Sequence, residues 1–335
     1  MSEILLSVQD LHTSFKTDAG IVSAVNGVSF DIDRGEMLGI VGESGSGKSV
    51  SAYSIMQILA GNGNISGGKI LYKGQDLTTW DEKQMRDFRG KCCSIIFQDP
   101  MTSLNPVFTI GNQLLEAITL HTDKKGKVAW DRAVEMLELV GINEPTKRLK
   151  QYPYELSGGM RQRVMIAMAL ACEPDILIAD EPTTALDVTI QAQILEQIQD
   201  LQKKMGMAVL LVTHDLGVIA EMCDNIIVMY GGRVCERGTA EEIFYNPKHE
   251  YTKGLLRSIP NVNNMGKKLE PITGTPINML NLPKGCSFCT RCDQAMKICL
   301  TEQPQESTIN EDHMASCWLN IRDAYMEKNG GVVNE

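Results

Sequence analysis

The sequence contains no apolar run long enough to cross a lipid bilayer. A membrane-spanning helix needs roughly 18–20 consecutive apolar residues, whereas the longest run here, around residues 208–212, has the length of a buried strand. The opening MSEILLSVQD also lacks the basic start and apolar stretch of a secretory signal. We therefore expect a chain that stays in the cytosol, where cysteines are kept as thiols.

The sequence also lacks an excess of positive charge. Its 32 Lys and Arg residues stand against 42 Asp and Glu residues, giving a net charge of −10. Such a chain has little overall attraction to nucleic acid or to an anionic membrane surface. It shows no internal repeat and no heptad run typical of a coiled coil. A length of 335 residues, with 43% hydrophobic, fits one large α/β domain and a smaller attachment.

Apolar patterning predicts alternating strands and helices along most of the chain. We expect strands over residues 4–15, 22–32, 36–41, 175–179 and 208–213. Helical periodicity is expected over residues 49–59, in much of 105–154 and between the last two strands. A hairpin is expected to turn at Gly231 and Gly232. After residue 259 the chain becomes rich in Pro, Gly and Asn, which indicates a linker or a loop-rich cover.

A glycine-rich segment follows the third predicted strand and precedes a predicted helix. Residues 42–49 read GESGSGKS and match the phosphate-binding pattern G-x-x-x-x-G-K-[ST] in the context that this pattern requires. Lys48 can reach the β- and γ-phosphates, and the Ser49 hydroxyl can ligate Mg²⁺. The helix that follows points its positive end at the anion. The expected contacts to ATP in this loop are Gly42, Ser44, Gly45, Gly47, Lys48 and Ser49.

Two acidic residues end a strongly apolar strand. Asp180 and Glu181 follow the sequence ILIA, and a buried strand has no structural need for adjacent carboxylates at its exit. We expect Asp180 to hold Mg²⁺ and Glu181 to act as the general base toward the attacking water. A strand that ends in Asp-Glu is a weak signal alone, but it is strong after a phosphate loop.

The segment LSGGM at residues 156–160 resembles the signature motif of ABC ATPases. A Ser-Gly-Gly that opens a helix is physically a second anion site, because a hydroxyl, free N–H groups and the helix dipole converge there. The resemblance implies that Ser157, Gly158 and Gly159 meet the γ-phosphate of ATP held by an opposite subunit. The chain would then be half of a head-to-tail pair that encloses two ATP molecules.

Other positions resemble elements of the same family. Gln98 is similar to the glutamine that senses Mg²⁺ and the attacking water, and His214 to the switch histidine. The Ala-Leu-Asp sequence at residues 185–187 resembles the loop that links the two halves. Phe15 is a candidate for the aromatic residue that stacks on adenine, although its alternation could equally place it in the core.

The sequence around the motifs resembles that of the ATPases of oligopeptide and dipeptide importers. It includes QDPMTSLNP from residue 98, LSGGMRQR, and an extension with NPKH and YT after residue 245. The resemblance implies an α/β ABC nucleotide-binding domain over residues 1–258, with a mixed sheet, an antiparallel β subdomain and a helical subdomain. A small cysteine-rich extension would occupy residues 259–335.

That resemblance also implies a function and partners. The chain would power import of short peptides from the cytoplasmic side of the cell membrane, with nickel import as an alternative. The implied partners are a second, related ATPase subunit, two transmembrane permease subunits and an extracytoplasmic substrate-binding protein. A soluble ABC ATPase of DNA repair or translation is the other class considered. Its members typically carry coiled-coil insertions or two motor domains, and this sequence has neither.

Half of the cysteines crowd into the extension. Cys92, Cys93, Cys172, Cys223 and Cys235 are scattered and are expected to be small buried residues. The tail resembles the subfamily pattern G-C-x-F-x-x-R-C followed by two more cysteines. That pattern assigns Cys286, Cys292, Cys299 and Cys317 to a [4Fe-4S] cluster, with Zn²⁺ or free thiols as alternatives and Cys289 as a spare ligand. A staple of this kind would help a loop-rich tail to fold.

Overall fold

The computed structural model describes residues 3–98, 103–183, 187–258 and 271–328, and the chain divides into two compact units. The first unit comprises Met1–Ser7, Asp31–Met37 and Leu71–Val212. The second comprises Val8–Phe30, Leu38–Ile70 and Thr213–Glu335. Because the chain passes from one unit to the other within several strands, neither unit is one continuous stretch of sequence.

Three parallel strands in the order β8-β7-β6 form the centre of the first unit. Every residue of β7 and β8 is buried, which is why these strands read as near-continuous aliphatic runs. The elements of this unit are β5 (Gln75–Asp76), α2 (Glu82–Asp87), β6 (Cys93–Ile96), α4 (Ile110–His121), α5 (Lys127–Leu139), α6 (Pro145–Arg148), α7 (Gly158–Leu170), β7 (Ile176–Asp180), α8 (Val188–Met205) and β8 (Ala208–Thr213).

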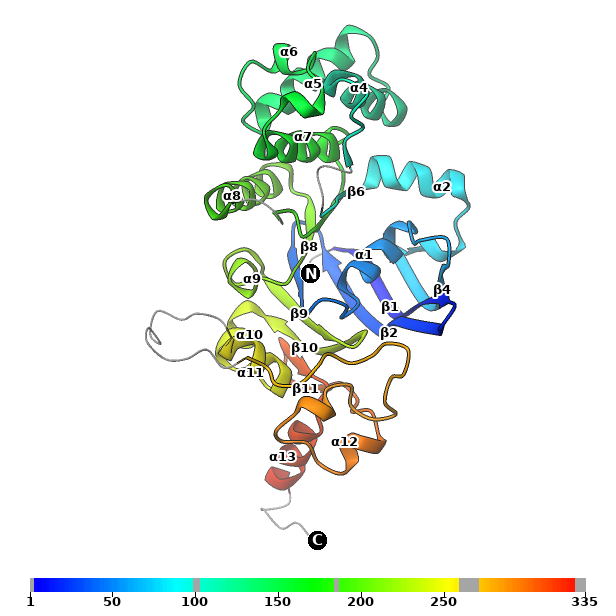
Figure 1. The fold of residues 1–335 in the computed structure, drawn as a ribbon, viewed down its shortest axis with the longest axis vertical. Coiled ribbons are helices and arrows are strands. Elements are labelled where there is room, and N and C mark those ends of the chain that lie inside the picture. The colour runs from blue at the N-terminus through cyan, green and yellow to red at the C-terminus, as the bar shows by residue number, and fades with distance from the viewer. Residues whose placement is uncertain (1–2, 99–102, 184–186, 259–270, 329–335) are drawn as a thin grey trace. The chain divides into compact units, whose positions relative to one another are not determined.

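Helices α4, α5, α6 and α7 lie together as a helical subdomain of the first unit (Figure 1). Helix α4 buries Ile110, Leu114 and Ile118, which are spaced four residues apart and therefore share one face. The predicted helical periodicity between residues 105 and 154 is confirmed by this packing. No helix in the described part of the chain is long and apolar enough to span a membrane.

The second unit contains a sheet in the strand order β11-β12-β10-β9-β3. Strands β3 and β9 are parallel, and β9 and β10 form the predicted hairpin, with Gly231 and Gly232 at positive φ. The long strands β1 and β2 are joined by a two-residue turn, and β4 lies on the other side of β1. The elements of this unit are β1 (Ile4–Thr17), β2 (Gly20–Asp33), β3 (Met37–Val41), α1 (Lys48–Met56), β4 (Gly63–Tyr72), α9 (Leu216–Met222), β9 (Asn225–Tyr230), β10 (Arg233–Thr239), α10 (Ala240–Tyr245), α11 (Glu250–Arg257), α12 (Ile298–Thr301), β11 (Ser307–Asn310), β12 (His313–Ala315) and α13 (Trp318–Lys328).

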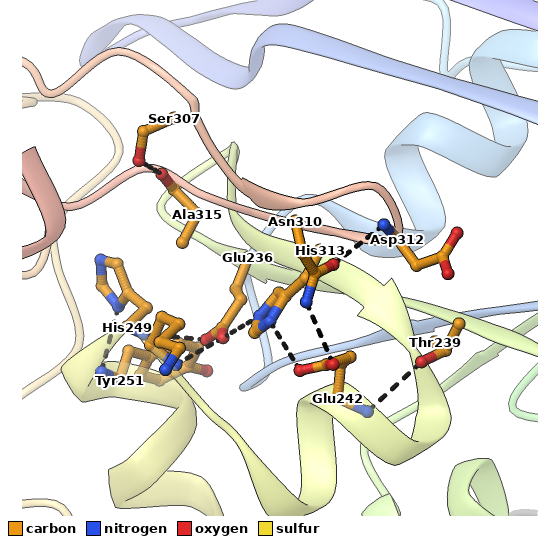
Figure 2. Close-up of polar contacts among 11 residues, drawn as sticks. Glu236, Thr239, Glu242, His249, Tyr251, Ser307, Asn310, Asp312, His313 and Ala315 are labelled. Atoms are coloured by element: carbon orange, nitrogen blue, oxygen red, sulfur yellow. Dashed lines mark hydrogen bonds and ion pairs between the residues drawn. The ribbon is translucent and has the colours of Figure 1, made fainter. Parts of the chain in front are cut away.

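The C-terminal segment is attached to this sheet by a buried polar cluster around His313 (Figure 2). Strand β12 pairs with β10, and His313 Nε2 lies 2.7 Å from Glu236 Oε1 while its Nδ1 lies 3.2 Å from Glu242 Oε2. Glu236 also accepts the backbone N–H groups of Lys248 at 2.6 Å and His249 at 2.9 Å. Burial alone would raise the pKa of Glu236, but the hydrogen bonds from His313 and its other partners outweigh burial and lower it. The cluster therefore holds a carboxylate in the interior at the junction of sheet and tail.

The scattered cysteines are only partly as predicted. Cys93, Cys223 and Cys235 are buried, in agreement with the interpretation as small apolar residues. Cys92 and Cys172 are half-buried instead. Cys92 lies at the end of a short π-helical segment, Phe88–Cys92, before β6, where the chain has not yet entered the buried sheet.

Candidate functional site

The phosphate loop occupies the turn between β3 and α1 in the second unit. Gly42, Gly45 and Gly47 have φ values of 157°, 77° and 100°, a region that side-chain-bearing residues rarely adopt. A Cβ on Gly42 would collide with the carbonyl oxygen of Met229, and one on Gly47 would lie 2.5 Å from the carbonyl oxygen of Ala24. Glycine is therefore required at these positions, and the backbone N–H groups can turn inward around an anion.

Polar groups of this loop face inward. The Lys48 ammonium donates to the carbonyl oxygens of Gly42 at 2.7 Å and Glu43 at 3.0 Å, and the residue is 5% exposed. The Ser46 hydroxyl is buried and has no hydrogen-bond partner among the described residues. Helix α1 begins at Lys48, so its N-terminal N–H groups follow directly. A loop with a sequestered ammonium and an unsatisfied hydroxyl fits a phosphate ligand.

The acidic end of β7 lies in the first unit. Asp180 is the last residue of the strand and is 1% exposed. Glu181 follows with φ at 46°, and its N–H donates to the Val212 carbonyl oxygen at 2.8 Å. The Gln98 amide donates to Glu181 Oε2 at 2.8 Å, so the structure brings together two residues predicted to act in catalysis. A positive φ at a residue other than glycine costs on the order of 1–3 kcal/mol and is typical of functional sites.

The signature segment forms the start of α7, also in the first unit. The Ser157 hydroxyl accepts the N–H of Met160 at 3.4 Å and caps the helix, while Gly158 and Gly159 form its first turn. Gln162 is 1% exposed and donates to the carbonyl oxygen of Pro182. This contact joins α7 to the residue that follows Glu181. Sequence reasoning missed the role of Gln162, although a polar residue on an inward helix position was a usable signal.

The remaining predicted site residues lie on different strands, helices and connections. Phe15 on β1 is half-buried, and its ring packs against Gly63, where a Cβ would lie 2.6 Å from Phe15 Cε1. His214 is exposed between β8 and α9 in the second unit. Asp187 caps α8 by accepting the Ile190 N–H at 3.0 Å, whereas residues 185 and 186 lie outside the described part of the chain. Residues 99–102 after Gln98 are also outside it.

The five tail cysteines gather around one small cavity of about 20 Å³, room for about one water molecule. Its lining comes from Cys286, Cys289, Cys292, Cys299 and Cys317, together with His249, Glu250, Phe288, Gln294, Trp318 and Leu319. In the described residues, no three His, Cys, Asp or Glu side chains are arranged to hold a metal ion. The predicted cluster is therefore not supported by the arrangement of these side chains, although its ligands line the same cavity.

Burial changes the chemistry of these thiols. It raises the pKa of Cys286 to about 12 and that of Cys292 to about 11. Backbone N–H groups act in the opposite direction: Phe288 donates to Cys286, Gln294 to Cys292, and Leu319 and Asn320 to Cys317. Amide donors aimed at sulfur stabilise a thiolate, which is the form that binds metal.

A phosphate loop, an acidic strand end with a bound glutamine, and a serine-capped signature helix together define a P-loop ATPase of the ABC class. Two family models match the chain: one described as "ABC transporter" over residues 25–184, and one described as "Oligopeptide/dipeptide transporter, C-terminal region" over residues 235–299. The chain belongs to the family of ATP-binding proteins of dipeptide and oligopeptide ABC transporters.

Relatives extend over nearly the whole chain. It is 53% identical over 318 residues to the dipeptide transport ATP-binding protein DppD of Bacillus subtilis, covering 95% of both chains. It is 49% identical to the oligopeptide transport ATP-binding protein OppD of Salmonella typhimurium, covering 96% of both. Among solved structures, an ATP-binding cassette described as a dimer in a post-hydrolysis state with ADP and Pi aligns at 27% identity. Its TM-score is 0.63, over 70% of this chain and 98% of that one. The ABC fold expected from the sequence is confirmed.

Proposed function

We propose that this chain is the ATP-hydrolysing subunit that powers import of short peptides, acting at the cytoplasmic side of the cell membrane. The observation that carries the ATPase is the contact between Gln98 and Glu181 at the exit of β7, in a chain with a complete phosphate loop. The peptide substrate is supported by the relatives, which are named for dipeptide and oligopeptide transport. Those names favour peptides over the nickel alternative.

The proposed chemistry assigns a role to each polar group. The glycines of the loop, with Ser44, hold the phosphates by backbone N–H groups, and Phe15 stacks on adenine. Lys48 releases its carbonyl partners and binds the β- and γ-phosphates. Ser49, Asp180 and Gln98 supply oxygens for Mg²⁺, which neutralises phosphate charge when bound. Glu181 accepts a proton from the attacking water, a role worth about 10²–10⁴-fold in rate.

A second set of roles needs a partner subunit. Ser157, Gly158 and Gly159 present a hydroxyl, N–H groups and a helix N-terminus, which suit the γ-phosphate of ATP held by a second, related ATPase subunit. His214, as the switch histidine, would contact the γ-phosphate and needs no partner subunit for this. ATP binding would then join the two subunits and hydrolysis would let them part. Two permease subunits and an external substrate-binding protein would couple this motion to peptide passage.

For the extension, proposed to begin at residue 259 after a motor of residues 1–258, we propose a [4Fe-4S] cluster on Cys286, Cys292, Cys299 and Cys317, with Zn²⁺ as the alternative and Cys289 as the spare. Support comes from the cysteine pattern and from the amide donors to sulfur. In the described residues the sulfurs line one cavity with room for about one water molecule and are not arranged to hold a metal ion, so binding requires them to rearrange. Such a centre would cross-link a segment with little core of its own. Anaerobically purified protein should show broad absorbance near 400 nm and about four irons per chain. One zinc per colourless chain would replace the cluster by a structural zinc site.

The transport proposal is tested by uptake of labelled peptides in cells that lack this chain. Wild-type protein should restore uptake of a labelled dipeptide and tripeptide, whereas Glu181→Gln should not. Glu306→Gln, which alters an ion pair with Arg237 outside the phosphate loop, the acidic strand end and the signature segment, serves as a matched control and should restore uptake fully. Restoration of ⁶³Ni²⁺ uptake without peptide uptake would contradict the proposed substrate.

A further inference from the structure

Arg291 connects the cysteine-rich tail directly to the phosphate loop. It lies in the 3-10 turn Cys289–Arg291, immediately before Cys292. Its Nη1 lies 2.6 Å from Glu43 Oε2 and its Nη2 lies 3.0 Å from Glu43 Oε1, a bidentate pair within the second unit. Glu43 is the second residue of the phosphate loop. The pair therefore joins the cysteine segment to the nucleotide machinery across 248 residues of sequence.

Two rings of a buried aromatic cluster pack against the guanidinium. Tyr230, Tyr251 and Phe288 are buried and have ring centroids 4.7–5.3 Å apart. The guanidinium carbon lies 5.7 Å from the Tyr230 ring and 5.9 Å from the Phe288 ring, within range of cation–π attraction. Arg291 Nε also donates to the Thr273 carbonyl oxygen at 2.9 Å. With its side chain only 3% exposed, Arg291 is held in one orientation.

Glu43 links Arg291 to the backbone of the phosphate loop. Its backbone N–H donates to the Tyr251 hydroxyl oxygen at 2.8 Å, and its carbonyl oxygen accepts from Lys48 at 3.0 Å. The same residue is thus held through its side chain by Arg291 and through its backbone by Tyr251. Lysine could not replace the planar guanidinium of Arg291, because an ammonium cannot bind both carboxylate oxygens of Glu43 in a fixed plane.

We infer that Arg291 is a positioning residue for the phosphate loop, so that the cysteine-rich extension sets the affinity of this chain for ATP. The inference deepens the proposed ATPase function and depends on it. If the loop occupies its binding-competent conformation only a fraction of the time, the apparent Kd for ATP rises by the reciprocal of that fraction. Because Arg291 stands beside Cys289 and Cys292, any change in that turn reaches the loop through the same pair.

The test compares equilibrium binding of a fluorescent ATP analogue to variants of the full-length chain. Arg291→Gln should bind about tenfold more weakly, a value within the range of coupling between contacting residues. Arg291→Lys should bind with intermediate affinity. Arg237→Gln is the matched control, because Arg237 makes a similar bidentate pair with Glu306, at 2.8 and 2.7 Å, without approaching the loop. It should bind as the wild type does.

A cycle with Glu43→Gln separates positioning from loss of structure. If Arg291 acts through Glu43, the double variant should bind no more weakly than the weaker single variant. Linkage is reciprocal, so ATP should also slow amide hydrogen exchange over residues 286–299 in the wild type and less so in Arg291→Lys. Wild-type affinity for ATP in folded Arg291→Gln and Arg291→Lys would overturn the inference. So would a double variant whose loss of binding free energy equals the sum of the losses in the two single variants. A wild-type chain that binds no ATP would instead overturn the proposed function.

Discussion

Removal of the Glu236 carboxylate should loosen the attachment of the C-terminal segment. Glu236 is fully buried on β10 and accepts from His313 on β12 at 2.7 Å, and from the N–H groups of Lys248 and His249 (Figure 2). The His313 ring lies between two carboxylates, with Glu236 at Nε2 and Glu242 at Nδ1. Glu236→Ala leaves that ring with one partner and leaves two backbone donors with none.

The size of the effect follows from this burial. A buried donor that loses its acceptor costs about 1–3 kcal/mol, and the His313 ring and the N–H groups of Lys248 and His249 all lose Glu236, so we expect a total of about 3–5 kcal/mol. For a cooperative unit of 150–250 residues, each kcal/mol shifts Tm by about 2–4 °C, so Glu236→Ala should lower Tm by roughly 6–20 °C. Glu306→Ala is the control, because Glu306 forms a partly exposed pair with Arg237 whose loss should cost only about 0–1 kcal/mol.

Thermal unfolding of the purified chain, followed by circular dichroism, measures both variants. Limited proteolysis at 25 °C should release the segment after β10 faster in Glu236→Ala than in Glu306→Ala. Equal Tm values for the two variants would refute the reasoning. That result would mean that the buried cluster stabilises the fold no more than a surface ion pair does.

Three further predictions concern the loop, the pH response and the tail. Lys48→Ala should weaken ATP binding itself, and wild-type affinity in a binding titration would count against the phosphate-loop assignment. Burial lowers the pKa of His249 to about 4 from 6.5. As the pH falls, the unfolded chain therefore binds the proton before the folded chain does. The free energy of unfolding should fall by about 3 kcal/mol between pH 6.5 and pH 4. His249→Asn keeps a side-chain acceptor for the Tyr251 N–H, which His249 Nδ1 binds at 3.1 Å, and should flatten this dependence in urea unfolding; an unchanged slope would contradict the assignment. Cys317→Ala should disorder the tail, seen as faster proteolysis after residue 271, while the circular dichroism of the motor fold persists; a globally unfolded chain would contradict this prediction.

The sequence predicts elements best where one local pattern decides them. The buried strands β7 and β8 read as aliphatic runs, and the paired glycines at 231 and 232 mark the turn between β9 and β10. Strand β4 was missed because Gly63, Gly67 and Gly68 interrupt its pattern. The tail hairpin of β11 and β12 was missed because its strands are only four and three residues long.

The candidate site divides in the same way. The phosphate loop, the acidic exit of β7 and the signature serine were predicted because each is contiguous in sequence and has a mechanism tied to its spacing. The ion pair of Arg291 with Glu43 and the cluster of His313 with Glu236 span 248 and 77 residues. Such contacts depend on the tertiary fold, and no local pattern marks them. The cysteine pattern predicted a shared metal centre. The five cysteines do line one cavity, but in the described residues their side chains are not arranged to hold a metal ion.

The most direct test of the ATPase account is phosphate release by the assembled transporter complex containing Glu181→Gln. The account predicts that this variant binds ATP as tightly as the wild type and releases phosphate at least about 100-fold more slowly, because the general base that Gln98 contacts has been removed. Turnover close to the wild-type rate in a complex that still binds ATP would contradict the role of Glu181 and, with it, the central claim.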